Sequence, residues 1–162
     1  DLLPVLLPGG LAAQAAEGRL LRLRGQLRSF NNRSGVGSRL VLTVYAQELQ
    51  PGLDEPQNQI TLSGALCKSP IFRRTPLGRS ICDLMLAVPR RYGRADYLPV
   101  IAWGQLAVRA SRLHVGDPLA LEGRVQSRTY HKTLESGETE ERTAYEVSMM
   151  RLLDPEGLER DA

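Results

Sequence analysis

The sequence is poor in the residues that build metal sites and disulfide frameworks. It contains two cysteines, Cys67 and Cys82, and two histidines, His114 and His131, which lie far apart. They lack the spacing of a zinc site, and two cysteines are too few for a disulfide-stapled fold. We therefore expect no metal and no cofactor. We interpret the cysteines as buried thiols in a reducing cytoplasm, with a redox pair as the alternative.

Long apolar runs and catalytic motifs are also missing. No run approaches the roughly 18 residues that a membrane-spanning helix needs, and there is no phosphate loop of the GxxxxGK type. The acidic cluster of Glu135, Glu138, Glu140 and Glu141 has the composition of a metal-dependent nuclease site. It falls in a polar hairpin without rigid support, however. We predict that the protein is not an enzyme.

Charge is modest in total but unevenly distributed. The net charge is +3, yet residues 59–133 hold twelve Lys and Arg against four Asp and Glu, whereas residues 134–162 hold three against nine. A basic body is typical of a protein that binds a polyanion, and a solvated charged face is the alternative. The predicted phosphate-binding residues are Arg73, Arg74, Arg79, Arg90, Arg91, Arg94, Arg124, Arg128 and Lys132.

Aromatic residues make up only 5% of the chain, but four of them fall at strand ends or in loops beside one predicted sheet face. Rings interleaved with arginine suit a surface that stacks on unpaired bases while neutralising phosphates. The predicted base-stacking residues are Tyr92, Tyr97, Trp103 and Tyr130. Packing in the core is the alternative for each ring, above all for Trp103.

From Gln59 onward the sequence indicates short strands separated by turns. Residues 59–67 alternate polar and apolar side chains, with Gly64 marking a bend, and residues 75–78 form a turn. Further strands are expected at 80–88, 98–103, 119–128 and 144–153, with a short helix after Gly104 and a polar hairpin over 132–142. This order predicts an all-β fold, a five-stranded Greek-key OB barrel with one short helix.

The expected core follows from the same periodicity. The strand at 80–88 is apolar on both faces apart from Asp83 and should be central. The strand at 119–128 should direct Leu119, Leu121, Gly123 and Val125 inward. The apolar stripe of the helix comprises Leu106, Ala107, Ala110 and Leu113.

An internal repeat links the two parts of the chain. Residues 1–13 match 96–108, residues 18–29 match 116–127, and residues 40–45 match 144–149, all in one order. Such a pattern indicates a duplicated unit. We expect a partial, degenerate OB-like unit at 1–53 that lacks its first strands, a complete OB domain at 59–153, and an acidic tail at 154–162. We interpret the chain as a fragment of a longer one, with a processed or deliberately trimmed product as the alternative.

Four segments follow one another in a recognisable order: residues 70–78 (PIFRRTPLG), 86–88 (LAV), 101–107 (IAWGQLA) and 116–128 (GDPLALEGRVQSR). Together they resemble the bacterial single-stranded DNA-binding protein family. The two-unit organisation is similar to a divergent Firmicutes-type branch. The resemblance implies an OB fold, binding of single-stranded DNA with little sequence specificity, and base stacking on the four aromatic residues named above. It also implies a homo-oligomer that contacts replication or repair proteins in the cytoplasm, associated with the nucleoid.

This sequence departs from the family pattern in three respects. Tyrosine stands where the family has tryptophan at three of the four stacking positions, and the acidic end lacks the family's Pro-Phe tip. The first repeat holds Leu2, Pro8 and Asn32 at the equivalent positions, so we expect it to be mainly structural. The alternative function is a protein-interaction module or primosome-like accessory subunit in which Trp103 is buried at an interface.

Overall fold

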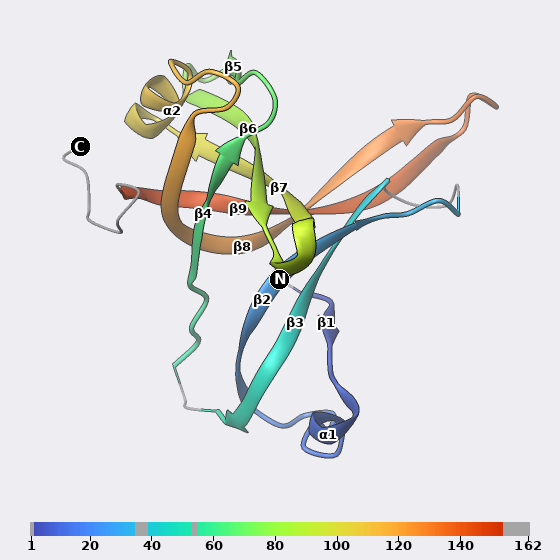
Figure 1. The fold of residues 1–162 in the computed structure, drawn as a ribbon. Helices are drawn as coiled ribbons and strands as arrows, with labels where there is room; N and C mark the ends of the chain where they lie inside the picture. The colour runs from blue at the N-terminus through green and yellow to red at the C-terminus, as the bar shows by residue number, and fades with distance from the viewer. Residues whose placement is uncertain (1, 35–38, 53–54, 154–162) are drawn as a thin grey trace.

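The computed structural model describes residues 2–34, 39–52 and 55–153 (Figure 1). The first part of the chain contains β1 (Val5–Leu6), α1 (Gly9–Ala12), β2 (Leu21–Asn31) and β3 (Leu40–Pro51). The second part contains β4 (Ile60–Leu66), β5 (Ile71–Arg74), β6 (Ser80–Pro89), η1 (Arg91–Gly93), β7 (Ala95–Trp103), α2 (Gln105–Ala110), β8 (Pro118–Thr133) and β9 (Thr139–Leu153).

Five strands of the second part close into a barrel. The sheet runs β4-β8-β9-β7-β6-β5, and β4 also pairs with β6 through Ala65 opposite Ala87 and Leu66 opposite Leu86. The β7–β9 pair is parallel and the other pairs are antiparallel. The α2 helix connects β7 to β8. This is the all-β OB barrel that the order of elements predicts.

The barrel interior contains the residues that period two assigns to it. Leu119, Leu121, Gly123 and Val125 of β8 are all buried, as are Ala107 and Ala110 of α2. Leu106 and Leu113 pack against this core from its edge. Strand β6 is central, because it pairs with β7, β4 and β5. These core predictions are confirmed.

Two glycines allow the strands to bend around the barrel. Gly64 lies where β4 passes from β8 to β6, and a Cβ there would overlap the carbonyl oxygen of Ala87. Gly123 follows a register shift in the β8–β9 ladder, which identifies a β-bulge. A Cβ on Gly123 would overlap the carbonyl oxygen of Ser148. The barrel therefore requires a residue without a Cβ at both positions.

The first part of the chain forms a three-stranded sheet in the order β1-β3-β2. It reproduces the second part: β1 runs parallel to β3 as β7 does to β9, and a bulge precedes Gly25 as one precedes Gly123. The predicted match of residues 40–45 with 144–149 is wrong by one residue. Val44 pairs with Leu27, and Val147 pairs with Val125, which is the counterpart of Leu27 in the repeat. Val44 therefore corresponds to Val147 and not to Ser148. When two short strand segments are compared, a shift of one residue can give a similarity nearly as high as the correct alignment. Sequence similarity alone therefore does not fix their register.

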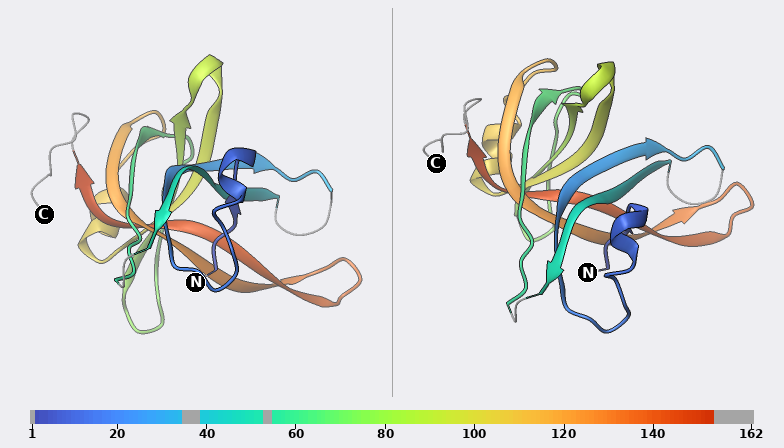
Figure 2. Two further views of the ribbon diagram at one scale, coloured as in Figure 1. Left: turned by 90° about the horizontal axis from the view of Figure 1, so that it is seen from below. Right: turned by 60° about the horizontal axis from the view of Figure 1, so that its bottom comes forward.

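Three local expectations also need correction. Ile71–Arg74 forms the additional strand β5, which is absent from the predicted strands and places Arg73 and Arg74 at the edge of the sheet. Strand β7 begins at Ala95, before the predicted residue 98. The polar hairpin over 132–142 is mostly a continuation of the β8–β9 ladder, which pairs as far as Thr133 opposite Thr139. In all views this long hairpin and the end of the β2–β3 pair extend to the same side (Figure 1 and Figure 2).

The two sheets share one hydrophobic core. Leu27 of β2 and Leu42 of β3 belong to the same buried cluster as Val125 and Val147 of the barrel. Two polar contacts reinforce this packing: the Ser29 amide donates to Asp96 Oδ1 at 2.9 Å, and the Tyr97 amide donates to Ser29 Oγ at 2.7 Å. The first sheet is therefore attached directly to the start of β7. None of the helices in the described ranges is long and apolar enough to cross a membrane.

Candidate nucleic-acid interface

One face of the barrel combines aromatic and basic side chains. Tyr97 and Trp103 are six residues apart on β7, and the uninterrupted β6–β7 register places them on the same side. Tyr97 is 48% exposed and Trp103 is half-buried. On β8 the alternate residues Arg124, Gln126, Arg128 and Tyr130 likewise share a face.

A shallow pocket of about 450 Å³ lies on this face. Its apolar wall is formed by Ile81, Ile101 and Trp103, and three arginines contribute to its lining. The full set of lining residues is Arg73, Ile81, Ile101, Trp103, Arg124, Gln126, Ser127, Arg128 and Glu146. Trp103 therefore lines an open surface and is not part of the core, and four of the predicted site residues meet in one place.

Two predicted aromatic residues have an arginine close to the ring. The guanidinium carbon of Arg79 lies 4.7 Å from the centre of the Trp103 ring, and that of Arg128 lies 6.0 Å from the centre of the Tyr130 ring. An arginine over a ring is held by a cation–π attraction. Each guanidinium group thus lies over one face of its ring.

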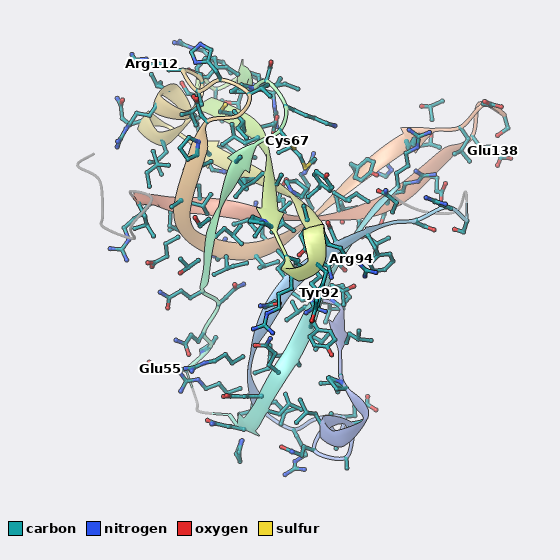
Figure 3. The ribbon with its side chains drawn as sticks, viewed as in Figure 1. Glu55, Cys67, Tyr92, Arg94, Arg112 and Glu138 are labelled. Atoms are coloured by element: carbon teal, nitrogen blue, oxygen red, sulfur yellow. The ribbon has the colours of Figure 1, made fainter. Side chains whose placement is uncertain are left out.

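Tyr92 lies apart from the pocket, in the loop between β6 and β7 (Figure 3). It is 97% exposed and has φ 65°, a left-handed conformation that is rare for a residue with a side chain. The next residue, Gly93, also has a positive φ of 72°, and the Arg90 amide donates to the Arg94 carbonyl oxygen at 2.7 Å, so both residues belong to the tight turn that joins β6 to β7. This turn places the Tyr92 ring in solvent.

Three of the nine predicted phosphate ligands already have a carboxylate partner. Arg73 Nε lies 2.9 Å from Asp83 Oδ2, Arg90 Nε lies 3.1 Å from Asp96 Oδ2, and Arg128 Nε lies 3.6 Å from Glu146 Oε1. The pKa of Arg73 is raised, chiefly because its side chain donates a hydrogen bond to Asp83. Within the described part of the chain, five make no ion pair or ring contact: Arg74, Arg91, Arg94, Arg124 and Lys132.

The partner carboxylates Asp83, Asp96 and Glu146 are the residues that sequence reasoning missed. Their pairing depends on strand register, which a list of charges does not reveal. The acidic cluster of the β8–β9 hairpin is different, because Glu140 pairs with Arg142 at 3.2 Å and its other members are exposed. Among the described residues no group of three or more His, Cys, Asp or Glu is arranged to hold a metal ion.

Both cysteines are free thiols. Cys82 is buried, and burial raises the pKa of its thiol to about 11. Cys67 is half-buried, and its thiol donates to the Met85 carbonyl oxygen at 3.3 Å. The prediction of a buried thiol is confirmed for Cys82, and Cys67 is only partly covered.

Replacing Asp96 with alanine should lower the free energy of unfolding by about 1–3 kcal/mol, because the buried Ser29 amide would lose its acceptor. Urea unfolding monitored by circular dichroism measures this change. Asp83→Ala is the matched control, since Asp83 also pairs with an arginine but is 38% exposed in its side chain, and we expect an effect below about 1 kcal/mol. Equal losses in the two variants would contradict the assigned role of Asp96.

The Single-strand binding protein family matches residues 57–153 of this chain. The single-stranded DNA-binding protein of Thermus aquaticus is 40% identical over 103 residues, which is 60% of this chain and 38% of that protein. The single-stranded DNA-binding protein B of Bacillus subtilis is 30% identical over 112 residues, which is 65% of this chain and 97% of that protein. The chain thus matches about two fifths of the length of the Thermus relative.

Solved structures extend the likeness to the first sheet. The crystal structure of the wild-type Thermus aquaticus single-stranded DNA binding protein superposes with a TM-score of 0.77 and 28% identity. The superposition covers 98% of this chain and 71% of that one. The barrel, its arginine-rich face and the match over residues 57–153 agree, and the chain therefore belongs to the single-strand binding protein family.

Proposed function

We propose that this chain binds single-stranded DNA with little sequence specificity, and so protects it during replication, repair or recombination. Bases stack on Tyr92, Tyr97, Trp103 and Tyr130 while basic side chains neutralise the phosphates. The observation that carries this proposal is the open pocket in which Trp103 and three arginines meet on one barrel face. Stacking on rings is tolerant of sequence because every base has a π-face.

The basic residues contribute unequally in this proposal. Arg74, Arg91, Arg94, Arg124 and Lys132 are exposed and have no carboxylate partner in the described residues, so phosphates meet their full charge. Arg79 contributes from its place over the Trp103 ring. Arg73, Arg90 and Arg128 must share their guanidinium groups with Asp83, Asp96 and Glu146. We therefore assign the larger part of the salt dependence to the unpaired group.

We also propose how the chain is organised and where it acts. Residues 1–53 form a partial, mainly structural OB-like unit, which the shared bulge glycines Gly25 and Gly123 support. Residues 59–153 form the binding domain. The acidic tail at 154–162 lies outside the described residues. We further propose that the protein acts in the cytoplasm, assembles as a homo-oligomer, and serves in binding and not in catalysis.

Reversing two loop charges in the double variant Arg91→Glu/Arg94→Glu should weaken binding about tenfold or more and make it less sensitive to salt, because phosphate contacts are lost. Fluorescence anisotropy of a labelled thymidine oligonucleotide, titrated at several salt concentrations, measures both effects. The control is Arg109→Glu/Arg112→Glu, the same charge change on and just after α2, at the opposite end of the barrel from the Tyr92 loop (Figure 3). We expect less than a threefold effect from the control.

The slope of affinity against salt provides a second readout. If the five unpaired residues supply the contacts, the logarithm of the association constant should fall with the logarithm of salt with a slope of about −3.5. If all nine contribute, the slope should be about −6. Absence of binding at low salt would reject the proposed function and favour the protein-interaction module.

A further inference from the structure

The pocket beside Trp103 contains a carboxylate that phosphate binding does not explain. Glu146 lines this pocket although it is only 5% exposed, and it lies among Arg73, Arg124 and Arg128. A negative charge at this position repels phosphate. The backbone of a bound strand should therefore stay with the more exposed arginines, and the space next to Glu146 is left for a different part of the ligand.

The hydrogen bonds of Glu146 show how its carboxylate is held. Glu146 of β9 lies directly opposite Gln126 of β8, and Gln126 Nε2 donates to Glu146 Oε1 at 3.1 Å. Arg128 Nε lies 3.6 Å from the same oxygen. In the described part of the chain no hydrogen bond is made to Oε2. Glu146 is thus fixed through one oxygen and retains acceptor capacity on the other.

The shape of the pocket suits a nucleobase. Its volume of about 450 Å³ lies within the range of small-molecule sites. The indole of Trp103 together with Ile81 and Ile101 supplies an apolar wall for a flat ring. A base that stacks there presents its polar edge to the other lining residues, of which Glu146 and Gln126 are paired across β8 and β9.

Carboxylates accept hydrogen bonds from the exocyclic amino group of cytosine. Uracil and thymine carry a carbonyl oxygen at that position, which would face the carboxylate as one acceptor against another. We propose that this pocket is a nucleobase subsite in which Glu146 accepts a hydrogen bond from an exocyclic amino group, so that cytosine is preferred to uracil or thymine there. This inference rests on the proposed function and adds a base preference at one position.

The test compares short oligonucleotides of deoxycytidine and deoxyuridine, which are of equal length and share the same sugar and phosphates. The protein should bind the deoxycytidine strand about fivefold more tightly, since one bound base in the strand is read in this way. In Glu146→Gln the ratio of the two affinities should fall to about one, because an amide can donate to a carbonyl as well as accept from an amino group. Loss of a negative charge could raise the affinity for both strands alike, and the ratio of the two affinities cancels such a common gain.

Glu122→Gln is the matched control. Glu122 also joins an arginine and a glutamine, through Arg151 Nη2 at 2.9 Å and Gln59 Nε2 at 3.1 Å, but it does not line the pocket. We expect its cytosine preference to equal that of the unmodified protein. A thermal melt of each variant shows whether it is folded.

A strand containing N4,N4-dimethyldeoxycytidine, which has no amino hydrogen, provides a second measurement that needs no variant. The unmodified protein should lose its preference for this strand. Equal affinity for the deoxycytidine and deoxyuridine strands would overturn the inference while leaving single-stranded DNA binding intact. A preference that persists in folded Glu146→Gln, or with the dimethylated base, would also overturn it. Failure to bind either strand would instead reject the proposed function.

Discussion

Replacing Trp103 with alanine is expected to weaken binding of a thymidine oligonucleotide by about 5- to 150-fold, the loss associated with one stacked base. The indole forms the apolar wall of the pocket with Ile81 and Ile101, and Arg79 lies over its ring. Alanine would remove both the stacking surface and the group that positions Arg79. Fluorescence anisotropy of a labelled oligonucleotide measures the change in affinity.

Two further variants make this expectation specific. Trp103→Phe keeps an aromatic face and should lose less affinity than Trp103→Ala. Phe30→Ala removes an aromatic residue from the first sheet that is 55% exposed, and it should change affinity by less than about twofold if that sheet is mainly structural. An unchanged affinity in Trp103→Ala, or a loss in Phe30→Ala of the same size, would contradict the assignment of the binding face.

Gly123→Ala is expected to lower the free energy of unfolding by about 3 kcal/mol, at the upper end of the usual cost of overpacking. The added Cβ would overlap the Ser148 carbonyl oxygen, which belongs to the backbone and cannot move away as a flexible side chain can. The strain would have to be relieved by opening the bulge between β8 and β9. Urea unfolding, monitored by circular dichroism, measures the change.

Gly10→Ala is the matched control for this substitution. Gly10 lies in α1, its φ is not in the left-handed region, and nothing lies within 4 Å of a Cβ placed there. Alanine at this position should be neutral or stabilise the protein by less than about 1 kcal/mol. If Gly123→Ala is as stable as Gly10→Ala, the bulge does not require a glycine, and the described packing of β8 against β9 is wrong.

The sequence predicts the barrel well where strands are half-buried. Leu121, Gly123 and Val125 alternate with the polar residues Glu122 and Arg124, and this alternation identifies both the strand and its inward face. Strand β5 has four exposed residues and therefore no such alternation. The outer part of the β8–β9 hairpin is polar on both faces, so it shows no such alternation either. Strands without a buried face are specified by their pairing partners, which a single sequence does not show.

The candidate site likewise has features that the sequence predicts and features that depend on strand pairing. Residue type and local spacing predict Trp103 and the arginines around it as candidate binding residues, and the structure brings Trp103, Arg73, Arg124 and Arg128 together at one pocket. The partners of those arginines are not predictable in this way, because Arg73 and Asp83 meet across β5 and β6, and Arg128 and Glu146 across β8 and β9. Paired and unpaired arginines look alike in a sequence. Distinguishing them requires strand register, which only the structure supplies.

Fluorescence of the single tryptophan, titrated with an unstructured thymidine oligonucleotide at low and physiological salt, tests the central claim most directly. Bases that stack on Trp103 should quench its emission strongly, and the quenching should require more oligonucleotide as salt rises, because phosphate contacts are screened. The absence of quenching at low salt, together with an emission maximum typical of a buried indole, would contradict the account and place Trp103 in a protein contact.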